Sequence, residues 1–257
     1  TGIEDPRIPY YIYNQMSATS TPDNNTEYRD GPFVSIYFGS AGENAAKSQQ
    51  NTVSLFGIYP VGGKYDDGSA EKASASSGTG AAPYRFITYA DVLYLQAELI
   101  SEGIVTGDPE AVLEQAMKES FRQIDYTIAN FVKPSQTVPP IYSETAGSDM
   151  MDYIDAVLAT FDGAPAARKL EIIMTQKWLS SIGSSVDQYT DYRRTGYPVM
   201  FDPKNPLHAP DGIVQPPIDG DPMNPGAQAA VPVQSTLPYP RSLPWAQTEL
   251  ETNPNAP

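Results

Sequence analysis

The spacing of apolar residues predicts a long helix near the middle of the chain. Between Leu113 and Phe131, apolar residues recur every three or four positions, which places them on one face of an α-helix. These residues are Leu113, Met117, Phe121, Ile124, Ile128 and Phe131. Asp108 is a suitable N-cap, and Pro109 suits the first helical position. We therefore predict a helix from residue 108 to about residue 132.

The same pattern predicts three further helices. They cover residues 88–103, 148–161 and about 166–192, and a glycine follows or ends the first two. The last helix is expected to place four apolar residues on one side: Leu170, Met174, Trp178 and Ile182. Short connections favour antiparallel neighbours, so we predict two helical hairpins packed together.

The regions on either side of the helices have a different composition. Residues 1–83 are rich in Gly, Ser, Asn and Tyr, and only short runs such as 33–38 have strand character. Residues 198–257 contain 14 of the 25 prolines, which block regular structure. We predict one domain in three parts: an irregular loop region (1–83), a helical core (84–197) and a proline-rich strap over the helices (198–257).

Composition argues against several classes of protein. The formal net charge of −15 disfavours binding to nucleic acid, whose phosphates would be repelled. The absence of cysteine excludes disulfides, thiolate nucleophiles and Cys-based metal sites. The single histidine, His208, leaves little scope for a catalytic triad or a His-rich metal site. We therefore expect no catalytic residues, no metal and no cofactor.

Charged side chains are interpreted mainly as structural. Adjacent acids at Asp66–Asp67 and Asp219/Asp221 could suggest glycosidase chemistry, and the second pair a calcium ion, but solvated turns account for both pairs better. His208 is interpreted as an exposed loop residue. Arg193 and Arg194 are expected to complement the dipole at a helix end. Glu98 is expected to be partly buried and paired with a base such as Arg85.

Tyrosines supply the candidate ligand site. Ten of the 17 tyrosines precede residue 95, many of them in the irregular region. A tyrosine ring offers a flat apolar face and a hydroxyl, which suit stacking on a sugar or a peptide side chain. We predict ligand contacts at Tyr37, Tyr59, Tyr65 and Asp66. The alternative for each tyrosine is packing of a loop against the helices.

Several segments, in order, resemble the SusD/RagB family of outer-membrane nutrient-binding lipoproteins of the Bacteroidetes. They are residues 5–11 (DPRIPYY), 84–98 (YRFITYADVLYLQAE), 176–179 (QKWL), 191–198 (DYRRTGYP), 237–241 (LPYPR) and 253–255 (NPN). Family members are usually about twice as long and carry a lipidated N-terminal cysteine. The resemblance therefore implies that this chain is the C-terminal half of such a protein, with the lipid anchor upstream.

The resemblance also implies a fold and a function. The expected fold is mainly α, with tetratricopeptide-like helical hairpins, long irregular loops and the proline-rich C-terminal strap. The expected function is capture of an oligosaccharide at the cell surface, on the outer membrane, and its delivery to a SusC-like TonB-dependent transporter. Ligand contacts vary within the family, so the four residues chosen above depend on composition alone. The alternatives are an oligopeptide binder, a structural scaffold that only docks on the transporter, and a glycan-cleaving enzyme.

Overall fold

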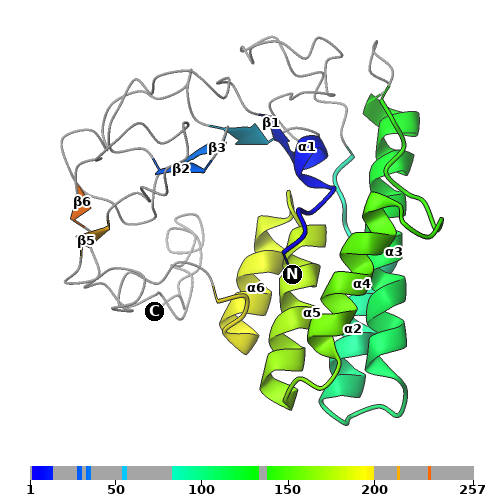
Figure 1. Ribbon diagram of the computed structural model, residues 1–257. Helices are drawn as coiled ribbons and strands as arrows, with labels where there is room; N and C mark the ends of the chain where they lie inside the picture. Colours follow the sequence, from blue (N-terminus) through cyan, green and yellow to red (C-terminus); the bar gives the residue numbers. More distant parts are fainter. Residues whose placement is uncertain are drawn as a thin grey trace, which may run out of the picture.

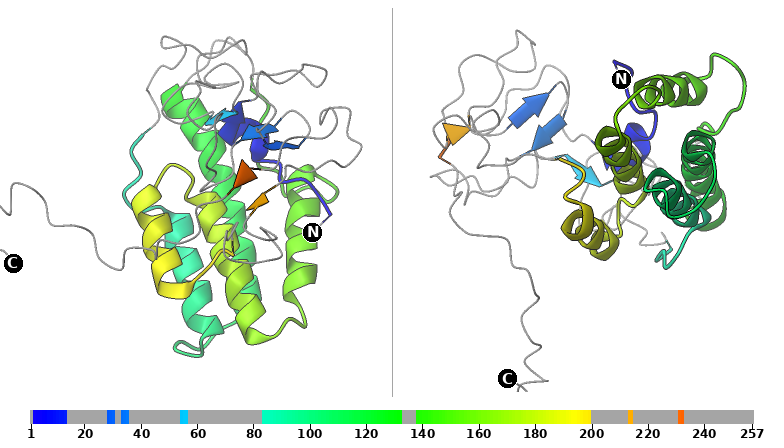
Figure 2. Two further views of the ribbon diagram at one scale, coloured as in Figure 1. Left: turned by 90° about the vertical axis from the view of Figure 1, so that its left-hand side faces the viewer. Right: turned by 90° about the horizontal axis from the view of Figure 1, so that it is seen from below.

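The computed structural model describes residues 2–13, 28–30, 33–35, 54–56, 83–132, 138–199, 213–214 and 231–232. This part of the chain is mainly helical, as the sequence predicts. The main helices are α2 (Tyr89–Ser101), α3 (Pro109–Thr127), α4 (Asp149–Phe161), α5 (Ala166–Ser180) and α6 (Ser185–Thr195). Figure 1 shows these helices side by side, and the right-hand view of Figure 2 shows them nearly end-on. In this bundle α2 packs against α3 and α5, while α4 packs against α3 and α5.

The predicted helix starts are confirmed by their caps. Thr88 accepts a hydrogen bond from the backbone N–H of Asp91, whose carboxylate accepts one in return, which forms a capping box. Asp108 and Ser148 cap α3 and α4, each with one side-chain oxygen that accepts at least one hydrogen bond from a backbone N–H group of the first turn. Gly103, with φ of 71°, follows the last turn of α2, in a conformation that suits glycine.

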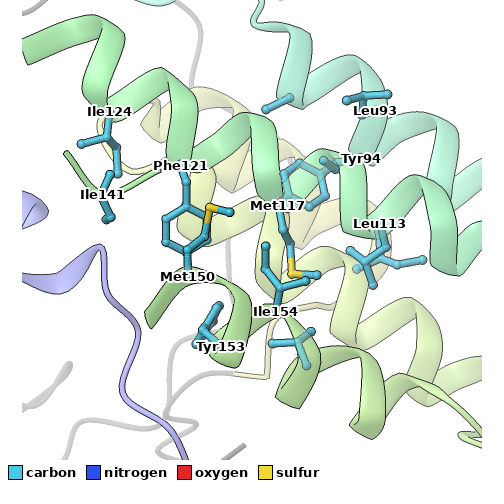
Figure 3. Close-up of a cluster of buried hydrophobic side chains, with 14 of the residues drawn as sticks. Leu93, Tyr94, Leu113, Met117, Phe121, Ile124, Ile141, Met150, Tyr153 and Ile154 are labelled. Atoms are coloured by element: carbon cyan, nitrogen blue, oxygen red, sulfur yellow. The ribbon is translucent and has the colours of Figure 1, made fainter. Parts of the chain in front are cut away.

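The core lies between α2, α3, α4 and α5. The predicted apolar face of α3 is buried from Leu113 to Ile128, whereas Phe131 is 40% exposed in the π-helical turn η1 (Ile128–Val132) that continues α3. Figure 3 shows Phe121 of α3 beside Met150 and Tyr153 of α4. The rings of Phe121 and Tyr153 meet edge to face, with their centroids 6.1 Å apart. The helical hairpins are therefore joined by one continuous apolar interior.

The prediction of one helix over residues 166–192 is wrong. The chain turns after Ser180, passes through Gly183 with φ of 98°, and starts α6 at Ser185. A positive φ at Gly183 is incompatible with a continuous helix. The predicted buried side is confirmed in part: Met174 and Ile182 are buried as expected, but Leu170 and Trp178 are only partly buried.

Polar residues account for this difference in α5. The fully buried positions include Ile173, Gln176 and Ser180, and two of these three side chains are polar. A pattern of apolar residues alone assigns Gln176 and Ser180 to the solvent side. Gln176 is buried because it bonds to Arg7 and Tyr153, as described below.

The N-terminal segment packs against one end of the helical bundle. It forms the short helix α1 (Ile8–Tyr11) and the strand β1 (Ile12–Tyr13), which pairs antiparallel with β4 (Leu55–Phe56). Figure 1 shows α1 and β1 beside this end of the bundle. Tyr10 and Tyr11 are buried in the main core. The sequence did not predict this helix, whose four residues are too few for a periodic pattern.

Two short antiparallel ladders complete the described structure. β2 (Tyr28–Asp30) pairs with β3 (Phe33–Ser35), which lies within the run expected to have strand character. β5 (Ile213–Val214) pairs with β6 (Val231–Pro232). The prediction that residues 198–257 contain no regular structure is therefore wrong for these four residues. Pro232 is at the end of its two-residue strand, a position where a missing N–H is tolerated.

Candidate functional site

A groove of about 760 Å³ lies between the N-terminal segment and the start of α4. Three pieces of chain form it: residues 3–10, residues 139–143 and the first turn of α4 from Ser148 to Asp152. The first piece is more than a hundred residues from the other two in the sequence, and those two are close neighbours along the chain. The contacts that hold each of them in place therefore determine the shape of the groove.

Arg7 holds the first piece against the bundle. Its Nε and Nη2 donate to Oδ1 and Oδ2 of Asp5 at 2.9 and 2.7 Å, a two-pronged ion pair. Its other contacts reach the helices, with Nη1 donating to Ser120 Oγ of α3 at 2.9 Å and Nη2 to Gln176 Oε1 of α5 at 3.1 Å. Tyr153 Oη of α4 lies 3.5 Å from Nη2. We call Asp5, Arg7, Ser120, Tyr153 and Gln176 the Arg7 cluster.

The Arg7 side chain is charged although only 1% of its surface is exposed. Burial by itself lowers its pKa, but the charge and hydrogen bonds of Asp5, together with Tyr94 and Tyr153, raise the pKa above its ordinary value. The guanidinium also lies over the ring of Phe121, 4.9 Å from its centroid. Arg7 therefore remains a buried cation whose hydrogen bonds fix its geometry.

Backbone contacts fix the second piece. Tyr10 Oη donates to the carbonyl of Pro139 at 2.7 Å, which joins the first piece to the second. Asp125 of α3 accepts from the backbone N–H groups of Ile141 and Tyr142, both at 2.9 Å. A carboxylate that accepts two backbone hydrogen bonds holds a loop firmly. Pro139 and Pro140 are exposed, so their rings present apolar surface to the groove.

The start of α4 supplies the third piece. Ser148 Oγ accepts from the N–H of Met151 at 3.3 Å and donates to the carbonyl of Ser143 at 2.8 Å. Asp149 and Asp152 lie in the first turn, where negative charge is favourable to the helix, and both are exposed. The groove thus has a nearly buried apolar base at Tyr10, Ile141 and Met150, apolar proline rings, and carboxylates at its edge.

The four predicted ligand contacts lie outside the described residues. These are Tyr37, Tyr59, Tyr65 and Asp66, and the acids Asp67, Asp219 and Asp221 and the histidine His208 also lie outside them. Within the described ranges, no group of three or more Asp, Glu or His side chains is arranged to hold a metal ion. The groove residues were not predicted as a site. The only sequence signal was the DPRIPYY segment, and Asp149 and Asp152 resemble ordinary helix-capping residues.

The predicted partner of Glu98 is corrected by the structure. Glu98 of α2 is buried and forms a two-pronged ion pair with Arg194 of α6, with 2.9 Å between Nη2 and Oε2. Arg194 also donates to Asp191 at 2.9 Å, and Lys177 of α5 pairs with the same aspartate at 2.7 Å. Arg85 donates to the carbonyls of Ser180 and Ile182, so it binds the end of α5.

Arg193 and Arg194 were expected to complement a helix end. Both lie in the last turn of α6, where cations are favourable. Arg194 additionally joins α6 to α2 through Glu98, a role that the sequence did not predict. Among the helices that the structure describes, none has the length and apolar character needed to cross a membrane.

Comparison with known proteins identifies relatives of this chain. No curated protein sequence matches it. It resembles the crystal structure of a SusD homologue from Bacteroides fragilis, with a TM-score of 0.50 and 21% identity over 79% of this chain and 40% of that protein. It also resembles a chitin-binding protein, with a TM-score of 0.50 and 18% identity over 82% of this chain and 38% of that protein.

These matches show the fold, and the chain spans about two fifths of the length of each of the two solved relatives. The family evidence comes from the sequence. A model of SusD-like proteins, described as "starch-binding associating with outer membrane", matches residues 1–216, so the chain belongs to the SusD-like family, as the segments at residues 5–11 and 84–98 indicated.

Proposed function

We propose that this chain is part of a cell-surface protein that captures an oligosaccharide and delivers it to a SusC-like TonB-dependent transporter in the outer membrane. Family membership supports this proposal, because the family description combines starch binding with association with the outer membrane. The chitin-binding relative supports a saccharide as the ligand. We further propose that a lipid anchor holds the protein at the membrane.

The groove between the N-terminal segment and α4 is the observation that carries the saccharide proposal. A sugar ring has apolar faces and hydroxyl edges, so it needs apolar surface and hydrogen-bond acceptors together. Pro139 and Pro140 offer exposed apolar rings, and Glu4, Asp149 and Asp152 offer exposed acceptor oxygens. A volume of about 760 Å³ is in the usual range for small-molecule sites.

The contacts predicted from the sequence at Tyr37, Tyr59, Tyr65 and Asp66 remain part of the proposal. A tyrosine ring that covers about 100 Å² of ligand contributes about 2.5 kcal/mol before the cost of association. Two or three such rings give binding roughly in the millimolar to micromolar range. These tyrosines and the groove are two separately testable groups of contacts.

The exposed apolar side of α2 favours a second candidate function, a structural scaffold for the transporter. Tyr89, Val92 and Leu95 are each about half exposed, and Tyr84 and Phe86 before the helix are 84% exposed. Apolar surface of this kind commonly contacts another protein. A scaffold would bind the transporter but no small ligand. An oligopeptide binder is the other alternative, and we propose no catalysis for either.

Native mass spectrometry of the full-length protein tests these functions. The protein is incubated with a mixed pool of neutral oligosaccharides and oligopeptides. Retained sugar supports the proposal, retained peptide favours the oligopeptide alternative, and retention of neither favours the scaffold. Turnover of any glycan in the same samples would contradict the non-catalytic assignment.

Calorimetry then separates the loop tyrosines from the groove. We expect a Tyr59→Ala/Tyr65→Ala variant to lose at least tenfold in affinity with an unchanged melting temperature. Tyr126→Ala is the control, because Tyr126 is an exposed tyrosine of α3 outside the groove lining. Unchanged affinity in the double variant would remove the tyrosines from the proposal and leave the groove.

A further inference from the structure

The charged side chains that the structure describes along the groove all carry the same sign of charge. They are Glu4, Asp5, Asp149 and Asp152, and none of the described residues that line the groove is a lysine, arginine or histidine. Apolar rings and backbone at the base of the groove do not offset these charges. The groove is therefore an electronegative surface around an apolar base, within a chain of net charge −15.

Arg7 offsets only one of these carboxylates. Arg7 is buried, and its guanidinium faces Asp5, Ser120 and Gln176 on the side of the helices. Its charge is matched by Asp5 at 2.7 Å, so Arg7 presents no positive surface to a ligand. Asp5 is correspondingly the groove acid with the least free negative charge.

The other three acids are exposed and uncompensated by side chains. Glu4, Asp149 and Asp152 take part in no ion pair with any other residue that the structure describes. The two bases beside the loop of residues 139–144, Lys118 and Arg122, are paired with Glu114, Glu119 and Glu144. The N-terminal end of the α4 dipole also lies at the groove, and its positive charge amounts to about half a charge at most.

We infer that this groove selects among saccharides by charge, holding those that carry protonated amines and rejecting those that carry carboxylates. This inference rests on the proposed function, since the apolar base and the proline rings bind the sugar and the three acids discriminate. A cationic substituent gains from each nearby carboxylate, whereas a uronate is repelled by each. In a solvated groove the effect of three such charges is about tenfold or more in affinity, and salt weakens it.

Three oligosaccharides of equal length provide the test: oligomers of glucosamine, of N-acetylglucosamine and of galacturonic acid. Affinities for the full-length protein are measured by calorimetry at about pH 6 and low ionic strength. We expect the glucosamine oligomer to bind at least tenfold more tightly than the galacturonic acid oligomer. Raising the ionic strength from about 0.02 to 0.5 M should remove most of this preference.

Two triple variants locate the effect. Glu4→Gln/Asp149→Asn/Asp152→Asn removes the groove charges and should abolish the preference. Glu102→Gln/Asp155→Asn/Asp162→Asn changes the net charge by the same amount at exposed acids outside the groove lining, and it should leave the preference intact. Circular dichroism melting checks that both variants fold, since Asp149 and Asp152 also favour the start of α4.

The outcomes separate this inference from the function on which it rests. Equal affinity for the three oligomers, or a preference that survives in the groove variant, would overturn the charge selection and leave saccharide binding in place. Failure to bind any of the three, including the neutral N-acetylated oligomer, would overturn the proposed function as well. Tighter binding of the galacturonic acid oligomer would reverse the inference.

Discussion

Arg7 and Gln176 are 169 positions apart in the sequence, and Nη2 of the arginine donates to Oε1 of the glutamine at 3.1 Å in the interior of the protein. Gln176 also donates through Nε2 to Tyr153 Oη at 2.9 Å. One buried side chain from the N-terminal segment thus bonds to helices α3, α4 and α5. Because Asp5 in the same cluster lines the groove, the groove and the core share these contacts.

Replacing Arg7 by methionine should destabilise the protein strongly. The change leaves Asp5 without its cation and Ser120, Tyr153 and Gln176 without a shared donor, all in a buried setting. Breaking a buried ion pair typically costs about 3–5 kcal/mol. We expect a loss of this size in the free energy of unfolding, measured by urea denaturation.

Arg168→Met is the matched control for that measurement. Arg168 pairs with Glu171 one turn along α5, and about half of its side chain is exposed. Exposed pairs of this kind contribute about 0.5 kcal/mol or less. Similar losses in the two variants would show that the Arg7 cluster stabilises the fold no more than a surface ion pair does.

The buried hydroxyl of Tyr94 should make the free energy of unfolding decrease at alkaline pH. Its hydroxyl is fully buried with no hydrogen-bond partner within the described residues, and burial raises its pKa, although the nearby Arg7 charge lowers it in part. The unfolded chain, with an ordinary tyrosine pKa of about 10, therefore loses its proton first as pH rises. The contribution of Tyr94 to the free energy of unfolding is therefore intact below about pH 10 and declines above it.

Tyr94→Phe should remove this decline. At neutral pH the variant should be as stable as the natural protein or more stable by about 1 kcal/mol, because no hydrogen bond is lost and an unpaired buried hydroxyl is removed. Between about pH 10 and 12 its free energy of unfolding should fall less steeply. A variant that is several kcal/mol less stable at pH 7 would contradict the absence of a partner for the hydroxyl.

Helices that combine a capping residue with a regular apolar face were predictable from the sequence. The pattern in α3 and the caps at Thr88, Asp108 and Ser148 required only local information. The break between α5 and α6 was not predicted, because a single glycine such as Gly183 is tolerated within a helix and does not by itself mark its end. The buried face of α5 was predicted only in part, since Met174 is buried as expected but Gln176 is buried through contacts with Arg7 near the start of the chain.

The groove could not be predicted from the sequence, for a related physical reason. Its lining comes from segments that meet only after Arg7 reaches α5 and Tyr10 bonds to Pro139. Asp149 and Asp152 resemble capping acids in a linear pattern, and their position at the edge of a groove depends on the loop beside them. The electronegative character of the whole chain was predictable, whereas its concentration in this groove was not.

The Glu98–Arg194 pair should hold α6 to the bundle. Glu98 is 5% exposed, and Arg194 supplies both of the described hydrogen bonds to its carboxylate. We expect Arg194→Met to lower the free energy of unfolding by about 2 kcal/mol, because it leaves a buried acceptor without its charged donor. The substitution should also increase the rate of backbone hydrogen exchange more in α6 than in α3.

Arg193→Met is the control for this pair. The two arginines are adjacent in α6 and both are exposed, but Arg193 lies over the ring of Tyr189. Loss of a contact at an exposed site of this kind costs about 0.5–1 kcal/mol. An equal effect of the two substitutions on exchange in α6 would show that general charge at the helix end, and not the bond to Glu98, holds the helix.

Asp125 connects the stability of the fold to the shape of the groove. Its carboxylate accepts the backbone N–H groups of Ile141 and Tyr142, which follow the exposed prolines of the groove wall. Asp125→Ala leaves both N–H groups unpaired and should cost about 1–3 kcal/mol. The wall should also become less ordered, so we expect weaker saccharide binding together with faster hydrogen exchange at residues 141 and 142.

Asp125→Asn separates the two effects, because the amide keeps one acceptor oxygen in nearly the same place. This variant should retain most of the stability and most of the affinity, with intermediate exchange at residues 141 and 142. If Asp125→Ala lost stability but bound the saccharide as tightly as the natural protein, residues 139–142 would not contribute to the ligand site. The loop tyrosines Tyr37, Tyr59 and Tyr65 would then be the remaining proposed contacts, and their alanine variants would decide where the ligand binds.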